Sequence, residues 1–133
     1  MYLENEFHKK IENPKMLSPL NLAFIGDGIY ELLVREHILR QANAPVNVLH
    51  KKAVELVRAS AQSKAVDLIY DMLTEEEIAI FQRGRNTSSS VPKNADVAEY
   101  RRATGLEALF GYLYCCNQNE RICELFEKIA SGT

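Results

Sequence analysis

Residues 21–39 read NLAFIGDGIYELLVREHIL, and this stretch decides the fold. Its apolar residues recur at helical spacing, so we expect one amphipathic helix that ends near Arg40. Ser18 followed by Pro19 is a typical helix start, because a capping side chain precedes proline at the first helical position. The sequence therefore predicts one long helix near the beginning of the chain.

The Gly26-Asp27-Gly28 triplet interrupts this helical pattern. Glycine inside a helix costs roughly 1 kcal/mol relative to alanine. A carboxylate among apolar residues loses hydration unless it gains a partner. Two penalties at one place indicate that something cationic approaches the backbone closely there. The alternative is a kinked helix whose Asp27 faces solvent.

A second helical stretch, residues 103–116, reads ATGLEALFGYLYCC and also carries a single acid, Glu107. Residues three and four apart share a helix face, so Gly111 lies beside Glu107. By the same spacing, Ala23 lies beside Asp27. Small residues at these places allow two helices to cross at close range. Because hard divalent cations prefer carboxylate oxygens on rigid elements, we predict that Asp27 and Glu107 meet and bind Mg²⁺.

Five stretches of the chain resemble one known family. LAFIGDGIYELLV (residues 22–34) resembles the signature helix of the ribonuclease III family, and GLEALFGYLY (105–114) resembles its second acidic helix. Its short members, the Mini-III ribonucleases, have the nuclease domain and lack a double-stranded-RNA-binding domain. The stretches that resemble these short members are PVNVLHKKAVELVRASAQ (45–62), RGRN (83–86) and KNADVAEYRRAT (93–104).

The resemblance spans about residues 17–125 and implies an all-α fold, the helical bundle of the ribonuclease III endonuclease domain, working as a homodimer. It implies a metal-dependent endoribonuclease that cleaves double-stranded RNA, with Asp27 and Glu107 as catalytic residues and metal ligands. Mg²⁺ is the expected cofactor and Mn²⁺ a substitute ion. The family association is maturation of large-subunit (23S) ribosomal RNA precursors. The alternative is a catalytically inactive helical module of the same fold that binds RNA or protein.

The sequence departs from the longer ribonuclease III enzymes at two of their acidic positions. Ala23 stands where they have glutamate, and Thr104 stands where they have aspartate. The number of metal ions is therefore open, and Glu31 and Asp96 are candidate auxiliary acids. The alternatives are that Glu31 is a solvated helix carboxylate and that Asp96 is a first-turn acid facing the helix dipole.

A polar, serine-rich stretch, RGRNTSSSVPK at residues 83–93, is the segment that we expect to be a true loop. Residues 83–102 contain five basic and two acidic side chains, in a chain whose formal net charge is −2. A basic strip beside an acidic metal site suits a polyanion, so we predict RNA contacts here rather than a plain linker. The predicted RNA-binding residues are Arg83, Arg85, Asn86, Lys93, Tyr100 and Arg101.

The apolar surface of the first long helix predicts self-association. Phe24, Ile25, Ile29 and Leu32 exceed what one helix face could bury within a monomer. Because burying one large apolar side chain contributes about 2 kcal/mol, an uncovered row favours a two-fold dimer. We expect a homodimer with Phe24 or Ile25 in its interface.

Composition limits the remaining possibilities. A chain of 133 residues is one domain, residues 1–133, and its near-neutral charge excludes a uniformly basic nucleic-acid coat. No apolar run approaches the ~20 residues of a membrane span, and MYLENEFHKK lacks the apolar core of a secretion signal. The three cysteines have no disulfide or zinc spacing, so we expect a cytoplasmic protein.

Two further local signals predict structure. We expect a short helical turn or arm within residues 1–17, and a capping box formed by Thr74 and Glu77.

Overall fold

The computed structural model describes residues 11–87 and 90–133, and within these ranges every regular element is a helix. The elements are η1 (Pro14–Met16), α1 (Pro19–Gln41), α2 (Val46–Val57), α3 (Ala59–Ile69), η2 (Tyr70–Met72), α4 (Glu75–Asn86), α5 (Val97–Cys115) and α6 (Asn119–Ser131). The predicted all-α fold is confirmed. None of the helices in these ranges is both long enough and apolar enough to cross a membrane.

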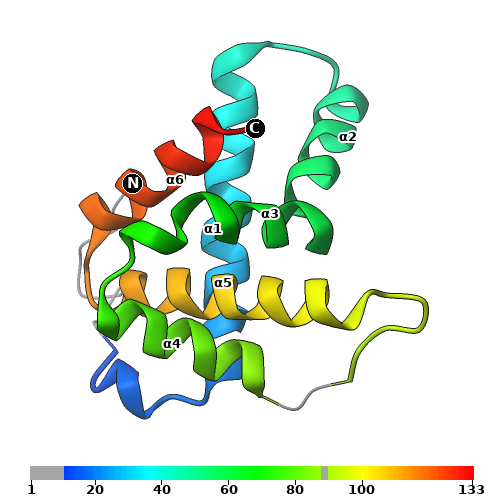
Figure 1. Cartoon of the computed structure of the whole chain (residues 1–133). Helices are drawn as coiled ribbons and strands as arrows, with labels where there is room; N and C mark the ends of the chain where they lie inside the picture. The colour runs from blue at the N-terminus through cyan, green and yellow to red at the C-terminus, as the bar shows by residue number, and fades with distance from the viewer. Residues whose placement is uncertain (1–10, 88–89) are drawn as a thin grey trace.

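Helices α1 and α5 cross at the centre of the molecule, and the other helices pack around this crossing (Figure 1). Helix α5 is the most deeply buried element, since its apolar side chains point into the core on several sides. Tyr30 of α1 packs edge-on against Phe110 of α5 and Phe126 of α6, with ring centroids 5.3 and 5.8 Å apart. The fully buried side chains of α5 are Leu106, Ala108, Leu109, Phe110 and Leu113.

Local sequence signals fix the starts of two helices. The Ser18 side chain accepts a hydrogen bond from the backbone N–H of Asn21 at the start of α1, at 3.2 Å. Thr74 and Glu77 form the predicted capping box at the start of α4, with each side chain accepting from the other residue's backbone N–H. Both predicted helix starts are confirmed. Each cap stabilises its helix, because it satisfies backbone N–H groups that have no partner within the helix.

The predicted loop at residues 83–93 is wrong in its first third, because α4 continues through Arg83, Gly84, Arg85 and Asn86. The reason lies in packing against α5. A Cβ atom on Gly84 would lie 2.8 Å from the Cβ of Ala108, so glycine fits where another residue would clash. Tertiary contact thus overrides the low helix propensity of glycine. The connection to α5 begins only at Thr87.

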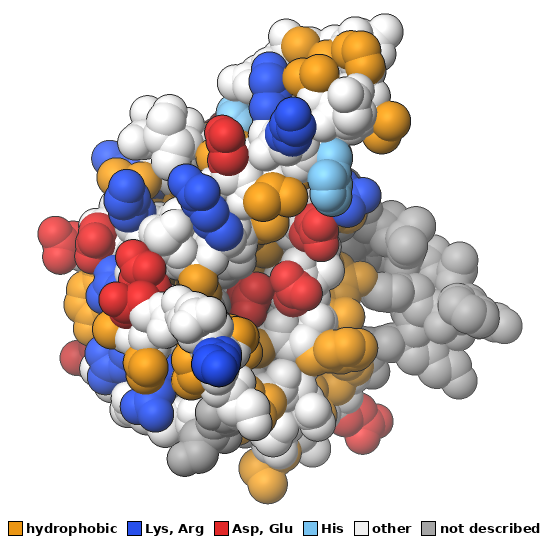
Figure 2. Space-filling view, turned by 90° about the vertical axis from the view of Figure 1, so that its right-hand side faces the viewer, with side chains coloured by type: hydrophobic (Ala, Val, Ile, Leu, Met, Phe, Trp, Pro, Cys, Tyr) orange, Lys and Arg blue, Asp and Glu red, His pale blue; other side chains and the backbone are white. Residues whose placement is uncertain are grey.

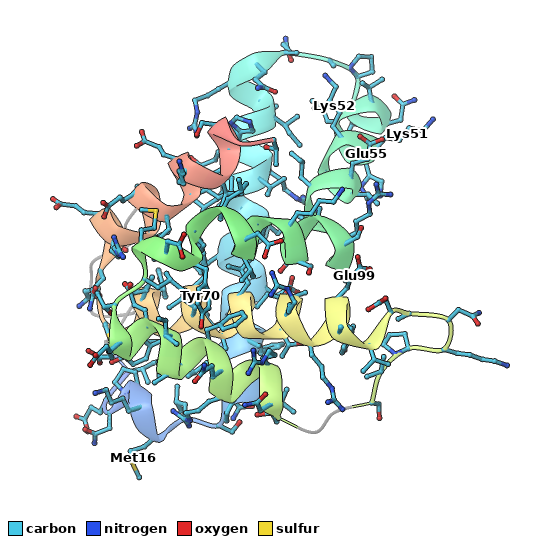
Figure 3. All side chains as sticks on the ribbon, in the orientation of Figure 1. Met16, Lys51, Lys52, Glu55, Tyr70 and Glu99 are labelled. Atoms are coloured by element: carbon cyan, nitrogen blue, oxygen red, sulfur yellow. The ribbon has the colours of Figure 1, made fainter. Side chains whose placement is uncertain are left out.

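The segment before α1 is joined to α4 by polar contacts. Residues 14–16 form a single 3-10 turn, and Lys15 makes a 3.0 Å ion pair with Glu76 of α4. Glu76 also accepts a hydrogen bond from the hydroxyl of Tyr112 on α5. Nearby, Tyr70 of η2 packs edge-on against Phe81 of α4, and Figure 3 shows its position. The turn predicted within residues 1–17 is thus observed at 14–16, while residues 1–10 lie outside the described ranges.

Candidate active site

Two glycines bring the backbones of α1 and α5 into direct contact. A Cβ atom on Gly26 would lie 1.7 Å from the carbonyl oxygen of Glu107, and one on Gly111 would lie 1.9 Å from that of Leu22. No side chain of any kind fits at either position. The close approach expected at the glycine–acid triplet therefore occurs between two helix backbones, and the cation expected there stays a prediction. It concerns Gly26 alone, since nothing lies within 4 Å of a Cβ on Gly28.

The helix crossing brings Asp27 and Glu107 together. Asp27 is exposed on α1, whereas Glu107 is partly buried on α5. Burial raises the pKa of the Glu107 carboxyl to about 8, and the charge of Asp27 and a hydrogen bond between the two side chains act in the same direction. Two carboxyl groups that share a proton form a site where a cation can replace that proton.

The residues at this pair fit a hard divalent cation. Within residues 11–87 and 90–133, no three His, Cys, Asp or Glu side chains gather into a group that could hold a metal ion. Two carboxylates nevertheless suit Mg²⁺, which keeps several waters and takes further oxygens from substrate phosphates. Gln62 lies against Glu107, and its buried Oε1 atom has no hydrogen-bond partner. A polar acceptor without a partner at this place is consistent with a site that water or a cation completes.

The two departures from the longer enzymes offer no anionic ligand. Ala23 is 7% exposed, and no side-chain oxygen is available there. The hydroxyl of Thr104 donates to the carbonyl oxygen of Tyr100 within its own helix, at 3.1 Å. Of the acidic positions compared with the longer enzymes, Asp27 and Glu107 are the ones that carry a carboxylate able to hold a metal ion.

The two candidate auxiliary acids make local contacts. Glu31 forms a 3.0 Å ion pair with Arg35, one turn further along α1. Asp96 caps α5, because its side chain accepts from the backbone N–H of Glu99 at 2.9 Å. Neither residue joins the Asp27–Glu107 pair in a three-acid group within the described parts of the chain. Glu31 is thus ion-paired on its own helix and Asp96 caps α5, and the role of both as auxiliary acids stays a prediction.

Three of the predicted RNA-binding residues lie in the last turn of α4 and are engaged by the protein itself. Arg83 donates to two backbone carbonyl oxygens of the segment before α1, both at 3.4 Å. The guanidinium of Arg85 lies over the ring of Phe81, 5.8 Å from its centroid, and its Nε donates to the side chain of Asn86. To bind RNA, these side chains would have to give up their contacts within the protein and form contacts with phosphates.

The other three predicted RNA-binding residues flank the start of α5. Lys93 and Arg101 are exposed, and neither forms an ion pair within the described residues. Tyr100 is half-buried and lies two helical turns before Glu107 on the same face of α5. Tyr100 is therefore the member of this group whose helix position places it toward Glu107, while Lys93 and Arg101 are exposed to solvent.

Sequence reasoning did not single out the basic side chains of α2. Lys51 and Lys52 project outward from this helix (Figure 3), and Arg58 is exposed between α2 and α3. None of the three forms an ion pair with any other residue that the structure describes. On the face shown in Figure 2, acidic side chains lie near the middle, with Lys and Arg side chains on several sides. The signal in the sequence was a short basic run in a helical pattern, which is usually a solvated face.

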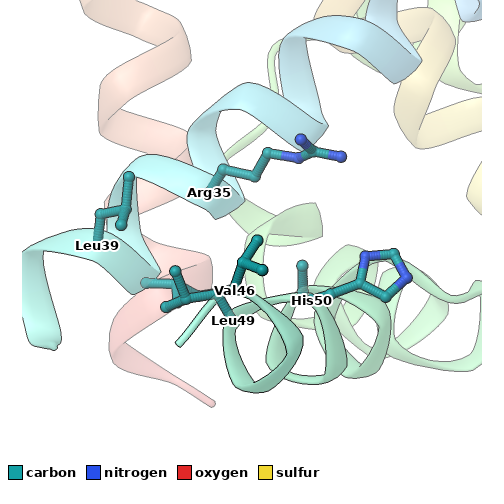
Figure 4. A pocket seen from close by; sticks show the side chains of 7 residues that line it. Arg35, Leu39, Val46, Leu49 and His50 are labelled. Carbon is teal, nitrogen blue, oxygen red and sulfur yellow. The ribbon is translucent and has the colours of Figure 1, made fainter. Parts of the chain in front are cut away.

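A groove between α1 and α2 is a separate feature of the surface. Its cavity measures about 190 Å³, and Leu39, Val46 and Leu49 contribute apolar walls (Figure 4). Arg35 and His50 are its polar lining residues, and no carboxylate lines it. The groove therefore lacks the acidic ligands that a metal-dependent hydrolytic site requires.

Comparisons with known proteins agree with this architecture. The Ribonuclease III domain family matches residues 20–118. The Mini-ribonuclease 3 of Thermoanaerobacter sp. (strain X514) is 50% identical over 127 residues, which are 95% of this chain and 89% of that protein. The Mini-ribonuclease 3 of Clostridium tetani (strain Massachusetts / E88) is 44% identical over 130 residues, 96% of this chain and 85% of that protein.

A crystal structure of a Fusobacterium nucleatum protein superposes on this chain with a TM-score of 0.83 at 33% identity. The superposition covers 92% of this chain and 98% of that one. The family match covers more than half of the chain, and the relatives cover nearly all of it. This chain therefore belongs to the ribonuclease III family and, within it, to the group of Mini-ribonuclease 3 proteins.

Proposed function

We propose that this ribonuclease III-type nuclease cleaves double-stranded RNA at the Asp27–Glu107 pair in a reaction that requires Mg²⁺, with Mn²⁺ as a substitute. The observation that carries the proposal is the crossing of α1 and α5, which joins one exposed and one partly buried carboxyl group. The raised pKa of Glu107 supports it, because a buried carboxyl beside a second acid is a recurrent feature of functional sites.

In this proposal the chain supplies charge and position. The carboxyl oxygens of Asp27 and Glu107 would hold the ion, and the proton that they share would pass to solvent. Bound Mg²⁺ would stabilise the charge that develops on the scissile phosphate and lower the pKa of the attacking water. The rigid contact between α1 and α5 keeps the two carboxyl groups at a fixed separation. Asp27 is exposed, so RNA can reach the site from solvent.

The basic side chains around the site supply the proposed RNA contacts. Lys93 and Arg101 meet phosphates directly, and Tyr100 lines the approach to Glu107. Arg83, Arg85 and Asn86 contribute at the end of α4. Duplex RNA suits such a surface, because it is recognised by shape, phosphates and 2′-hydroxyls more than by base sequence. A large-subunit ribosomal RNA precursor in the cytoplasm is the substrate and location that the family resemblance favours.

The exposed face of α1 supports a homodimer. Phe24 is 83% exposed and Leu32 is 41% exposed, while Ile29 and Leu33 are buried within the protomer. Ile25 is half-buried. The uncovered apolar surface is therefore narrower than the sequence suggested, and Phe24 dominates it. We propose that two copies pack through this face of α1, because a second copy would remove Phe24 from water.

The test uses purified full-length protein and a labelled RNA duplex of about 30 base pairs, with the single strand as the control substrate. Cleavage of the duplex should require Mg²⁺ or Mn²⁺ and stop with a chelator. Binding of the duplex without cleavage at any metal concentration would favour the inactive binding module. Sedimentation equilibrium on the same sample should give a dimer at micromolar concentration, and Phe24→Ser should shift it toward monomer.

A further inference from the structure

Gln62 is a polar side chain buried inside the protein, and it contacts Glu107 directly. It belongs to the first turns of α3 and is 3% exposed. Its Nε2 donates to Oε2 of Glu107 at 3.3 Å and to the backbone carbonyl of Val57 at 2.8 Å. Sequence reasoning gave no role to this residue, because a lone glutamine in a helix has no recognisable pattern.

The amide orientation of Gln62 is fixed by its partners. Both are acceptors, a carbonyl oxygen and a carboxylate oxygen, so the amide must present its NH₂ group to them. Rotating the amide by half a turn would place an oxygen against two oxygens. The Oε1 atom consequently points elsewhere, and it is buried without a hydrogen-bond partner. A merely structural tie to Val57 would not require the second contact with Glu107.

The backbone contact makes Gln62 a rigid support. Helix α2 ends at Val57, and Arg58 is extended (φ −64°, ψ 157°) before α3 begins. The carbonyl of Val57 is one of those at a helix end that have no partner in the helix. The Gln62 amide donates to this carbonyl oxygen and also to the Glu107 carboxyl group on α5. The contact thus connects the α2–α3 junction to one oxygen of the carboxyl group.

We propose that Gln62 is a positioning residue, whose amide holds the Glu107 carboxylate in the orientation that binds the divalent cation. The inference rests on the proposed metal-dependent function of the Asp27–Glu107 pair. It adds a residue that touches neither RNA nor the reacting phosphate and acts through Glu107. Groups that orient a metal ligand typically change metal affinity or activity by about 10- to 100-fold when they are removed.

The test compares Gln62→Met, which keeps the length of the side chain and removes the amide, with the control Ile69→Val. Ile69 is 1% exposed on the same helix, so this control reports the effect of disturbing the α3 core. Mn²⁺ binding is measured by calorimetry and electron paramagnetic resonance without RNA, and kcat and KM are measured separately with duplex RNA. Gln62→Leu replaces Gln62→Met if thermal melting shows that the latter is unfolded.

We expect Gln62→Met to weaken Mn²⁺ binding and lower kcat by about 10- to 100-fold, with KM for RNA within about twofold of wild type. Ile69→Val should leave both values near wild type. Wild-type metal affinity and kcat in a folded Gln62→Met protein would overturn the inference alone. A wild-type protein that neither binds Mn²⁺ nor cleaves duplex RNA would overturn the proposed function with it.

Discussion

The two faces of α1 place opposite demands on adjacent residues. On the face toward α5, Gly26 has no room for a Cβ atom, which would meet a carbonyl oxygen at 1.7 Å. On the outer face, Gly28 has open space and Phe24 is exposed, while Asp27 lies at the edge of the crossing, exposed and within reach of Glu107. The inner face is thus specified by packing, whereas the outer face leaves an acid and an aromatic ring available to other molecules. The Gly26-Asp27-Gly28 triplet therefore combines one position fixed by packing, Gly26, with two that are accessible to solvent, Asp27 and Gly28.

Gly26→Ala tests the inner face and should have the largest effect. The added methyl group would overlap the backbone of Glu107, and neither helix can move without losing core contacts. We expect a loss of unfolding free energy of about 3 kcal/mol or more, together with loss of cleavage. Thermal melting followed by circular dichroism measures this effect. A variant that melts within a few degrees of wild type would show that the crossing is less tightly packed than described.

Glu107→Gln separates stability from function at the same crossing. Burial raises the folded-state pKa of Glu107 to about 8, above its ordinary value of 4.5. The contribution of Glu107 to the stability of the metal-free protein should therefore be largest below about pH 4.5 and be lost as the pH rises to about 8, by a few kcal/mol. Glu107→Gln should lack this dependence and exceed metal-free wild type in stability at pH 8, while cleavage is lost. Urea unfolding at pH 5, 6.5 and 8 measures the difference. Equal pH dependence in the two proteins would remove Glu107 as its source.

The basic side chains also differ in whether they are exposed or bonded to the protein. Substitutions at Lys93, Arg101 and Arg83 test this difference. The side chains of Lys93 and Arg101 are exposed, so Lys93→Ala and Arg101→Ala should each weaken RNA binding and reduce the slope of log K against log[salt] by about 0.9. Arg83→Ala should weaken RNA binding less and in addition lower stability by about 1 kcal/mol, because its guanidinium bonds backbone carbonyl groups. Filter binding at several salt concentrations and thermal melting distinguish the two effects. The opposite pattern would make Arg83 the principal RNA contact.

Gly28→Ala should have the smallest effect and the opposite sign to Gly26→Ala. Nothing lies within 4 Å of the new methyl group, and alanine favours the helix. We expect an increase of about 0.5–1 kcal/mol in unfolding free energy. Urea unfolding measures it. Destabilisation of the isolated protomer by this change would place an undetected contact on the outer face of α1.

The elements with local signals could be predicted from the sequence. The start of α1 at Ser18 and Pro19 and the capping box at Thr74 depend on residues a few positions apart. The end of α4 was misplaced because Gly84 is held in the helix by Ala108, a contact between residues distant in sequence. The pairing of Asp27 with Glu107 required both the small-residue pattern and the family resemblance. Gln62 could not be found, because its importance lies in two hydrogen bonds that only the folded chain creates.

We propose that Asp27 and Glu107 jointly bind the cation on which cleavage of RNA depends. Asp27→Asn tests it directly, because the change keeps the side-chain volume and removes a charge on the exposed face. Mn²⁺ binding and Mg²⁺-dependent cleavage of duplex RNA should be measured on one sample whose fold is verified by circular dichroism. We expect an intact fold, weakened Mn²⁺ binding, and cleavage lower by about a hundredfold to a thousandfold. Wild-type cleavage by Asp27→Asn at saturating Mg²⁺ would contradict the account.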